Sequence, residues 1–371
     1  MRIGILCHPT FGGSGVVASE CALSLAEHGH RVHLFSPGVP PRLAHNSGAV
    51  VLHRVHGLDY PLFANSHAEL AATGAVLDVI ASEGLDVLHA HYALPHAVSA
   101  HLAREAARVN DAASVPRLVV TLHGTDVTLV AAAPAYAPLL RYVLGCADAV
   151  TAVSRDLSIR LRDWWGTAAG PIETLPNFVD THAFAPRAER EPGPLRSIHV
   201  SNFRPLKRVP WLIEAFARAS QGGDASLTLV GDGPELPRCR DLAAELGLGT
   251  RVRFLGERRD LPALLAAHDA FLLTSREESF GLSALEASSC GLGVLATRVG
   301  GLPEVVQDGA GGRLVAPDDQ NAFVRELVAW IADPARAHAF GVRGRARATA
   351  DFDRDTGVQR YADLYTRLLD R

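Results

Sequence analysis

The stretch AFLLTSREESFGLSALEASSCGLGVLA (residues 270–296) decides the fold of the second half of the chain. Its apolar run 270–273 is followed by a charged loop, a helical pattern at 281–289 and a second apolar run at 294–296. Short apolar runs that alternate with helices are typical of parallel strands joined by crossover helices. The stretch therefore predicts one strand-helix-strand unit of an open α/β sheet.

The same alternation extends in both directions from this stretch. Further strands are predicted at 3–7, 32–35, 87–90, 118–122, 149–152, 197–200, 227–230 and 252–255. The Pro- and charge-rich segment 185–194 has the composition of a linker. A chain of 371 residues fits two domains of about 150 to 200 residues each. We therefore predict two Rossmann-like α/β domains, 1–184 and 185–349, with a C-terminal helix at about 350–371 that packs back on the first.

Composition and charge exclude several classes of function. A formal net charge of −4 over the whole chain gives no global attraction to nucleic acid or to an anionic membrane. No apolar run approaches the roughly 20 residues that span a bilayer, and the first residues lack the features of a secretory signal. The five cysteines form no C-x-x-C pair, which argues against a disulfide framework and a zinc site. We expect a cytoplasmic protein without nucleic-acid, membrane or metal partners, and the sequence leaves a homo-oligomer open.

A glycine-rich turn, Phe11-Gly12-Gly13-Ser14-Gly15, follows the first predicted strand and opens a helix. Glycines let backbone amides approach an anion at the positive end of a helix dipole. The turn is not the dinucleotide fingerprint G-x-G-x-x-G, and the second strand ends in Ser36-Pro37-Gly38 without an acidic residue to hold a ribose. An NAD enzyme is therefore disfavoured, and the alternative is a tight turn without a ligand.

Histidines gather at the ends of two predicted strands in the first domain. His89 and His91 end one strand, Tyr92 and a further histidine follow it, and His123 closes the next strand. The carboxyl ends of parallel strands line the binding crevice of an open sheet. A zinc site is disfavoured because no carboxylate or cysteine stands beside these histidines at a metal spacing. We expect His89 and His91 to be structural hydrogen bonders, and His123 and Tyr92 to meet a substrate.

A basic turn, residues 201–208 (SNFRPLKR), follows the first strand of the second domain. Lys207 is the only lysine among the 36 Lys and Arg residues of the chain. Arg204 as a bidentate fork and Lys207 as a point charge can both bind a diphosphate. The alternative is a solvated basic turn, but the position after an apolar strand favours an anion site.

Two glutamates, Glu278 and Glu286, lie eight residues apart around a helix that is predicted to begin near Gly281. Eight helical residues rise about 12 Å, which is too far for a glycosidase pair acting across one bond. The spacing suits two anchors on different ends of one long ligand. Between them, the amides of Phe280, Gly281 and Leu282 would face a diphosphate at the helix N-terminus.

Together these motifs resemble the family-four retaining glycosyltransferases of the GT-B fold over almost the whole chain. Five of them occur in the family's order: the Arg204/Lys207 turn, 230–235 (VGDGPE), 254–256 (FLG), Glu278 to Glu286, and 299–304 (VGGLPE). The resemblance implies two Rossmann-like domains with a cleft between them and no cofactor. It also implies transfer of a sugar from a nucleotide diphosphate donor to a small acceptor.

Three segments of the chain resemble the bacillithiol-forming branch of that family: 8–17 (HPTFGGSGVV), 121–128 (TLHGTDVT) and 201–205 (SNFRP). This narrower resemblance implies UDP-N-acetylglucosamine as the donor and L-malate as the acceptor. The related mycothiol branch has an asparagine after the paired glycines to hold a phosphorylated inositol, whereas this chain has Gly15 there. The departure favours a smaller acceptor.

The resemblance also implies roles for residues around the donor. Arg204 and Lys207 would hold the diphosphate and Glu286 the ribose. Glu278 would bind the sugar hydroxyls, and His123 would meet the sugar at its far side. The residues that complete the implied donor site are Gly13, Ser279, Phe280, Gly281 and Leu282.

The implied acceptor cradle consists of Ser14, Tyr92, Thr125 and Arg141. Arg141 suits a carboxylate best, because a guanidinium forks onto two oxygens. With no carboxylate poised as a nucleophile, we expect front-face attack, in which the departing phosphate oxygen takes the proton of the malate hydroxyl and the anomeric configuration is retained.

Three alternatives stay open at this point. One is a related family-four enzyme with another sugar donor, or with a lipid or sugar acceptor. Another is a GT-B sugar-nucleotide epimerase, which would need a buried acid-base group in place of an acceptor cradle. The last is a sugar-nucleotide sensor without enzymatic activity.

Overall fold

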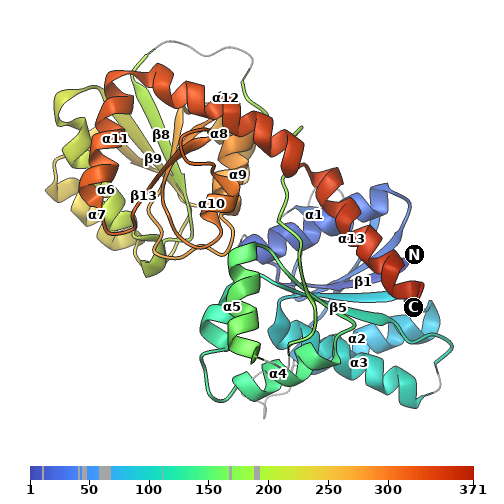
Figure 1. Cartoon of the computed structure of the whole chain (residues 1–371). Coiled ribbons are helices and arrows are strands. Elements are labelled where there is room, and N and C mark those ends of the chain that lie inside the picture. The colour runs from blue at the N-terminus through green and yellow to red at the C-terminus, as the bar shows by residue number, and fades with distance from the viewer. Residues whose placement is uncertain are drawn as a thin grey trace. The chain divides into compact units, whose positions relative to one another are not determined.

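The computed structural model describes residues 1–10, 12–40, 42–43, 48–57, 68–110, 112–166, 169–187 and 193–371, leaving out the side chain of Leu129. The chain divides into two compact units, shown in Figure 1. Unit 1 contains Met1–Asn177 together with Arg354–Arg371, and unit 2 contains Phe178–Asp353. Each unit is described by itself below.

Unit 1 is built on a parallel sheet with the strand order β3-β2-β1-β4-β5-β6-β7. Its strands are β1 (Arg2–Leu6), β2 (Arg31–Ser36), β3 (Val50–Arg54), β4 (Val87–His91), β5 (Arg117–Leu122), β6 (Ala149–Ala152) and β7 (Ile172–Thr174). Its helices are α1 (Gly13–Glu27), α2 (Ala68–Ser82), α3 (Val98–Val109), α4 (Ala137–Cys146), α5 (Arg155–Trp165) and α13 (Arg354–Leu369). The last helix packs against α1, so the C-terminus completes the unit that the N-terminus begins.

Unit 2 is built on a second parallel sheet with the order β10-β9-β8-β11-β12-β13. Its strands are β8 (Leu195–Val200), β9 (Ala225–Val230), β10 (Val252–Phe254), β11 (Ala270–Leu273), β12 (Gly293–Thr297) and β13 (Gly312–Val315). Its helices are α6 (Val209–Ala219), α7 (Leu236–Glu245), α8 (Leu261–Ala266), α9 (Leu282–Ser289), α10 (Leu302–Val305), α11 (Gln320–Ala332) and α12 (Pro334–Asp351).

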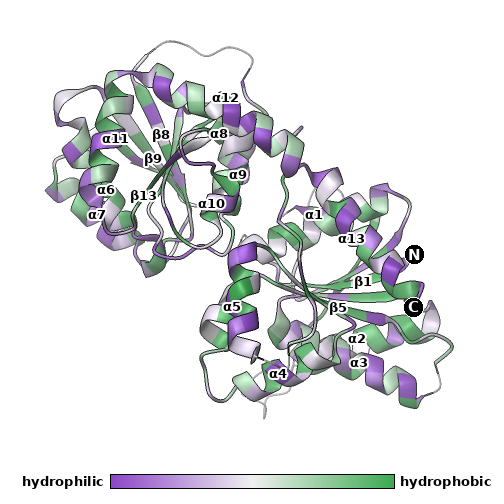
Figure 2. Cartoon of the chain, in the orientation of Figure 1, coloured by the Kyte–Doolittle hydropathy of each residue, from purple (hydrophilic) through white to green (hydrophobic). Residues whose placement is uncertain are grey.

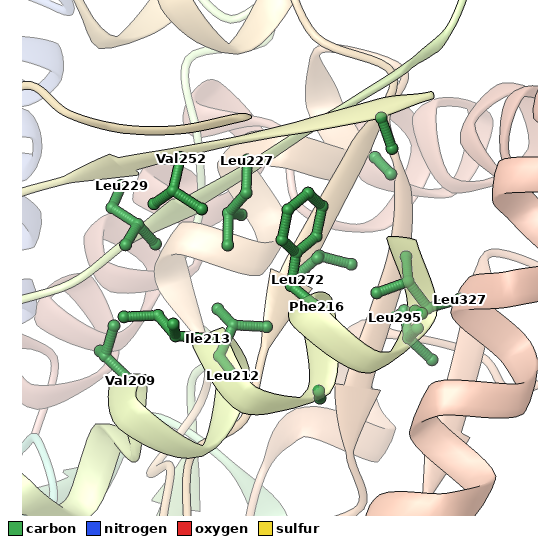
Figure 3. Close-up of a cluster of buried hydrophobic side chains, with 14 of the residues drawn as sticks. Val209, Leu212, Ile213, Phe216, Leu227, Leu229, Val252, Leu272, Leu295 and Leu327 are labelled. Carbon is green, nitrogen blue, oxygen red and sulfur yellow. The ribbon is translucent and has the colours of Figure 1, made fainter. Parts of the chain in front are cut away.

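The core of unit 2 shows how the sequence pattern produces this packing. Val209, Leu212, Ile213 and Phe216 follow the i, i+3, i+4, i+7 spacing of one helix face, and all four are fully buried. In Figure 3 these side chains of α6 point at the strands that carry Leu227, Leu229 and Val252. Figure 2 shows that the strands are mostly hydrophobic, whereas helices such as α5 and α13 combine hydrophobic and hydrophilic residues. Removing one such core leucine costs about 2 to 5 kcal/mol in comparable cores.

Most strands and helices predicted from apolar runs are present within one or two residues. The strands predicted at 149–152 and 270–273 match β6 and β11, and the helix predicted near Gly281 begins at Leu282. The strands β3, β7 and β13 were not predicted, because they are short and their pairing is set by the neighbouring strands. Of the predicted linker 185–194, residues 188–192 lie outside the described residues.

The division between the units falls a few residues before the predicted boundary at 184/185. Residues 178–184 belong to unit 2 because their backbone and side chains bond to it. The Val179 amide donates to Phe352 O at 2.9 Å, and the Thr181 hydroxyl donates to Asp353 at 2.5 Å. Phe184 O accepts hydrogen bonds from Ser289 Oγ and Arg345 Nη1. Within the described ranges, no helix combines the length and apolar character needed to cross a membrane.

Candidate functional site

Each sheet has one topological switch point, where the strand order reverses. In unit 1 it lies between β1 and β4, with Leu6 opposite Ala90, and in unit 2 between β8 and β11, with Phe271 opposite Ile198. Ligands of open α/β sheets bind outside the carboxyl ends of the strands at such points. The motifs predicted to bind ligands follow these four strands and the neighbouring β5.

The basic turn after β8 is held in a defined shape. Residues Pro205–Lys207 form one turn of 3-10 helix, and the Lys207 amide donates to Arg204 O at 2.8 Å. Thr274, just after β11, donates its hydroxyl to Lys207 O at 3.1 Å and to Arg208 O at 3.2 Å. The turn after β8 is thereby fixed to the end of β11, directly across the switch point.

Lys207 and Glu278 form a buried ion pair. Their Nζ and Oε1 atoms are 2.5 Å apart, and the side chains are only 16% and 11% exposed. Ser275 donates a second hydrogen bond to the same carboxylate oxygen at 2.7 Å. Lys207 and Glu278 lie 71 residues apart in the sequence, and both were predicted to bind the same ligand. The structure brings the two side chains into contact. Ser275 was not predicted, and no signal in the sequence distinguished it.

Two glycines of the 299–304 motif fix the backbone of Glu278. Gly300 has a φ of +49°, and a Cβ there would lie 1.9 Å from Glu278 O. The Gly301 amide donates to that same oxygen at 3.0 Å. Sequence analysis recognised this motif but gave it no role, and its role is to hold the loop that presents Glu278.

Helix α9 begins with Gly281 as its N-cap, in a left-handed conformation with a φ of +98°. The cap has no side-chain hydrogen bond and the first turn has no acidic residue. The first amides of the helix are therefore available to an anion at its positive end. Phe280 is buried against the ring of Phe352, with ring centroids 5.8 Å apart, and Glu286 is buried about one turn inside the helix. Ser279 and Leu282 are half-buried.

Arg204 is a cation that forms no ion pair with the described residues. Its Nε is buried and has no hydrogen-bond partner within the described part of the chain. A buried donor without a partner is costly unless a ligand satisfies it. Arg204 therefore presents the unsatisfied positive group of this site, next to the Lys207–Glu278 pair.

The loop 230–235 packs directly on the turn that precedes Arg204. A Cβ at Gly231 would lie 1.8 Å from Ser201 O, and one at Gly233 would lie 1.9 Å from Asn202 O. Both glycines have positive φ angles, +117° and +155°. These close approaches explain why the VGDGPE motif requires glycine at both positions.

In unit 1, the glycine-rich turn leads into α1 without a side-chain cap on Gly12. A Cβ at Gly15 would lie 2.5 Å from His8 O and 2.6 Å from Thr10 O, so the loop itself requires glycine there. A Cβ at Gly13 would meet no described atom within 4 Å. The fold does not require glycine at position 13, and Ser14 beside it is half-buried. Phe11 lies outside the described residues.

The strand ends after β4 and β5 are joined through side chains. Tyr92 donates its hydroxyl to Thr125 Oγ1 at 2.6 Å, and His91 Nδ1 lies 3.1 Å from His123 Nε2. Tyr92 has a φ of +96°, an unusual conformation for a residue with a side chain. The structure thus brings together three of the predicted site residues of this unit.

Asp126 is the buried carboxylate that shapes this region. It accepts hydrogen bonds from the amides of His123 at 3.2 Å and Gly124 at 2.8 Å, and from the Ala93 amide. Burial nevertheless raises the pKa of Asp126 to about 6, against the opposing effect of these amides. Sequence analysis missed this role, although Asp126 stands in the quoted segment 121–128.

Burial lowers the pKa of each histidine in this group. Desolvation brings the pKa of His89, His96 and His123 to about 3, and that of His91 well below its ordinary value. His89 is a structural hydrogen bonder, as predicted, because its ring nitrogens lie 2.6 Å from Tyr365 Oη and from Thr121 Oγ1. At neutral pH these imidazoles are uncharged and act as hydrogen-bonding groups.

Arg141 lies on the exposed surface of α4 rather than among the residues joined to Tyr92. Its guanidinium carbon lies 4.6 Å from the ring centroid of Trp164, and its Nη2 donates to Trp164 O at 3.2 Å. Its predicted acceptor role stays a prediction. Across the described residues, no cluster of three or more His, Cys, Asp or Glu side chains has the arrangement of a metal site.

The architecture and these sites define a class of protein. Two parallel Rossmann-like sheets, with a cationic turn and a helix N-terminus at the switch point of the second, are those of a GT-B glycosyltransferase. The family described as Glycosyltransferase Family 4 matches residues 11–183, and the family described as Glycosyl transferases group 1 matches residues 183–347. The chain belongs to glycosyltransferase family 4.

Two curated relatives match most of the chain. N-acetyl-alpha-D-glucosaminyl L-malate synthase of Bacillus anthracis is 37% identical over 98% of this chain and 96% of its own length. D-inositol 3-phosphate glycosyltransferase of Salinispora tropica is 32% identical over 95% of this chain and 80% of its own length.

Two solved structures share the fold over nearly their whole length. Sucrose-phosphate synthase from Thermosynechococcus elongatus has a TM-score of 0.81 at 24% identity, covering 100% of this chain and 99% of that one. Anabaena HepE in complex with UDP and glucose has a TM-score of 0.80 at 22% identity, covering 99% of each chain. At these identities the likeness shows the fold alone.

Proposed function

We propose that this chain transfers N-acetylglucosamine from UDP-N-acetylglucosamine to the hydroxyl of L-malate, with retention of the anomeric configuration, as the first step of bacillithiol biosynthesis in the cytoplasm. The observation that carries the proposal is the 37% identity to the malate synthase over nearly the whole of both chains. The sites of the two units supply the chemistry that this reaction needs.

Unit 2 offers a site for the donor's diphosphate. Arg204 has an unsatisfied buried nitrogen, Lys207 supplies an ammonium group, and the uncapped N-terminus of α9 supplies amides. Negative charge grows on the diphosphate as the glycosidic bond breaks, and fixed donors aimed at growing charge are usually the largest catalytic term. Lys207 would be shared between Glu278 and the departing phosphate, and Glu286 would hold the ribose.

Unit 1 offers a site for a small acceptor. The uncapped start of α1 presents the amides of Gly13 and Ser14, and Tyr92 and Thr125 present a bonded pair of hydroxyls. These groups suit the carboxylate and hydroxyl oxygens of L-malate. Arg141, held by Trp164, would meet a carboxylate of the acceptor, and His123 would meet the sugar.

Gly15 favours malate over an inositol phosphate. Any side chain at this position would collide with the carbonyl oxygens of His8 and Thr10 in this conformation of the loop. An asparagine that binds a phosphate from this position therefore does not fit. The Salinispora relative, named for inositol 3-phosphate, is also less similar to this chain.

In the proposed step the malate hydroxyl oxygen bonds to the anomeric carbon as the bond from that carbon to the phosphate oxygen breaks. The departing phosphate oxygen takes the hydroxyl proton, so UDP leaves and the new glycosidic bond lies on the same face of the sugar. No carboxylate of this chain is used as a nucleophile, and the protein's contribution is to position and stabilise charge.

A panel of donors and acceptors tests the proposal. UDP or GDP release would be measured with UDP-N-acetylglucosamine, UDP-glucose and GDP-mannose, each with L-malate, inositol 3-phosphate or no acceptor. We expect the highest kcat/KM with UDP-N-acetylglucosamine and L-malate. Preference for another pair would move the chain to another activity within its family, and epimerisation of the donor without any acceptor would contradict glycosyl transfer.

A further inference from the structure

His91 and His123 form a buried pair whose proton arrangement is not evident from the sequence. Nδ1 of His91 lies 3.1 Å from Nε2 of His123, so one hydrogen bond joins the two rings. His91 ends β4 and is fully buried, whereas His123 follows β5 and is half-buried. One ring must donate and the other must accept, because a neutral imidazole has one N–H and one lone pair.

Both rings are neutral in this environment. Burial lowers the pKa of His123 to about 3 and that of His91 well below its ordinary value. The neighbours that face His91 are His89, with ring centroids 4.1 Å apart, Tyr361 at 6.3 Å, and His96. None of these groups is charged at neutral pH, because burial lowers the pKa of His89 and His96 and raises that of Tyr361.

Either His91 donates to His123 or His123 donates to His91, and the second ring nitrogen of His91 decides between these two arrangements. Nε2 of His91 is buried and has no hydrogen-bond partner within the described part of the chain. If His123 donated to His91, the proton of His91 would sit on Nε2 as a buried N–H without an acceptor. If His91 donates from Nδ1, only a lone pair is left at Nε2. Orphaned buried N–H groups are rare in native proteins, so the second arrangement is favoured.

We infer that His91 donates its Nδ1 proton to Nε2 of His123 and thereby fixes His123 as the tautomer that carries its proton on Nδ1. His91 is then a positioning residue. Nδ1 of His123 makes no hydrogen bond within the described ranges of the chain, and the ring is only half-buried. His123 therefore presents an N–H donor, not a lone pair, to its ligand.

This tautomer has a consequence for substrate selection, which rests on the proposed function. A donor at Nδ1 favours a substrate oxygen that accepts a hydrogen bond, such as a hydroxyl or carbonyl oxygen of the sugar. It disfavours a ligand group that can only donate. Asp126 accepts a hydrogen bond from the backbone amide of His123 and so helps to fix the place of the ring.

Nitrogen-15 NMR of the full-length protein, labelled on histidine, tests the inference without turnover. Protonated and bare imidazole nitrogens have well-separated shifts, and a His123→Gln spectrum assigns the signals of His123. We expect Nδ1 of His123 to be protonated and Nε2 to be bare at neutral pH. A wild-type spectrum with the proton on Nε2 of His123 would overturn the inference, whatever the protein's substrate.

Two variants at His91 separate its tautomer role from packing. His91→Asn keeps a donor close to the position of Nδ1 and should keep the His123 tautomer, whereas His91→Leu removes the donor and should give a mixture. With UDP-N-acetylglucosamine and L-malate, we expect kcat/KM to fall about tenfold in His91→Leu. His91→Asn should stay within about threefold of the wild type. Equal loss in both variants with an unchanged tautomer would show a packing role and overturn the inference.

The chain offers a matched control in a second buried histidine pair. His33 Nδ1 lies 3.0 Å from His53 Nε2, and His33 Nε2 is likewise buried without a hydrogen bond among described residues. His33 lies in β2, which β1 separates from β4, the strand that carries His91. His33→Leu should therefore leave the His123 signals and kcat/KM unchanged, and a change of either in this control would overturn the specific link between His91 and His123.

Discussion

At the scale of single residues, the position of the Lys207 charge in unit 2 matters most for the proposed reaction. Lys207 is the only lysine of the chain, and its ammonium group is held 2.5 Å from Glu278 rather than exposed to solvent. An ammonium group is a compact charge that can be shared between two oxygen ligands, which suits a cation that must follow a departing phosphate.

Lys207→Ala should lower kcat by more than about tenfold, which corresponds to the loss of one charge-assisted contact of roughly 1.5 to 3 kcal/mol. The far-ultraviolet circular dichroism should be unchanged. Arg218→Ala serves as the control, because Arg218 is an exposed cation of α6 that bonds only Gln320 and Asn321 among the described residues. Equal rates for Lys207→Ala and wild type would remove Lys207 from the reaction.

Glu286 is proposed to hold the ribose, so its replacement should act on binding. In Glu286→Gln the buried side chain keeps its size, but an NH2 donor replaces one of the two carboxylate oxygens that would accept hydrogen bonds from the ribose hydroxyls. The Kd for UDP, measured by calorimetry, should rise about tenfold while kcat at saturating donor changes little. A defect in kcat with unchanged UDP affinity would show that Glu286 does not hold the ribose.

Asp126 makes a prediction for stability against pH. Its pKa is raised from 3.8 to about 6 in the folded protein, so folding favours its protonated form. The stabilisation is complete below pH 4 and is lost as pH rises through 6. Asp126→Asn should therefore gain about 2 kcal/mol in unfolding free energy relative to wild type between pH 4.5 and pH 8. Urea unfolding of both proteins at these two pH values measures the difference, and a constant difference would contradict it.

At the scale of elements, the loops that present functional groups depend on close backbone contacts. Gly300 illustrates this, because its positive φ and the 1.9 Å approach of Glu278 O leave no room for a Cβ. The 299–304 loop therefore acts on the site through the backbone of Glu278.

Gly300→Ala should displace the Glu278 loop and raise the Kd for UDP-N-acetylglucosamine at least about tenfold. Gly247→Ala is a matched control, since Gly247 also has a positive φ of +63° but no atom within 4 Å of its Cβ position. The control should lose about 1 kcal/mol of stability from backbone strain and keep its affinity. Equal affinity in both variants would contradict the proposed role of the loop.

The predictable and unpredictable elements differ in physical character. The strands β6 and β11 were predictable because apolar runs define them, and the start of α9 because Gly281 precedes a helical pattern. The short strands β7 and β13 were not, since their pairing is set by neighbouring strands rather than by their own sequence. The role of Lys207 and Glu278 as anchors of one ligand stays a prediction, and their direct ion pair was not predictable because it depends on tertiary geometry.

Roles that depend on the backbone were the hardest to predict. Asp126 accepts hydrogen bonds from amides of two loops, and Gly300 lies close against the carbonyl oxygen of Glu278. Neither contact has a local sequence pattern. The tautomer of His123 likewise requires the position of His91 on a neighbouring strand, which only the sheet register provides.

At the scale of the whole molecule, buried neutral histidines make stability depend on pH. His89, His91, His96 and His123 all have pKa values well below 6.5 in the folded protein. A group with a lowered folded pKa of this kind stabilises the fold above its unfolded pKa, and this contribution is lost as pH falls below about 6.5. Asp126 acts in the opposite direction, but it is one group against four.

On unfolding at pH 5, these five groups together should therefore bind about three more protons than in the folded protein. The unfolding free energy should then fall by roughly 4 kcal/mol for each unit by which the pH is lowered near pH 5. Because domains have unfolding free energies of about 5 to 15 kcal/mol, we expect acid unfolding above pH 4. Urea unfolding at intervals from pH 7 to pH 5, followed by circular dichroism, measures the slope. An unfolding free energy that stays constant across this pH range would contradict the conclusion that these histidines are neutral in the folded protein.

Proton NMR and mass spectrometry of one reaction mixture would test the proposed sugar transfer to malate most directly. Purified protein would be incubated with UDP-N-acetylglucosamine and L-malate, with a parallel sample lacking malate. We expect UDP and a product of sugar-plus-malate mass only when malate is present, with the anomeric coupling of an α-glycoside. A β-linked product, or no malate-dependent product while another acceptor is glycosylated, would contradict it.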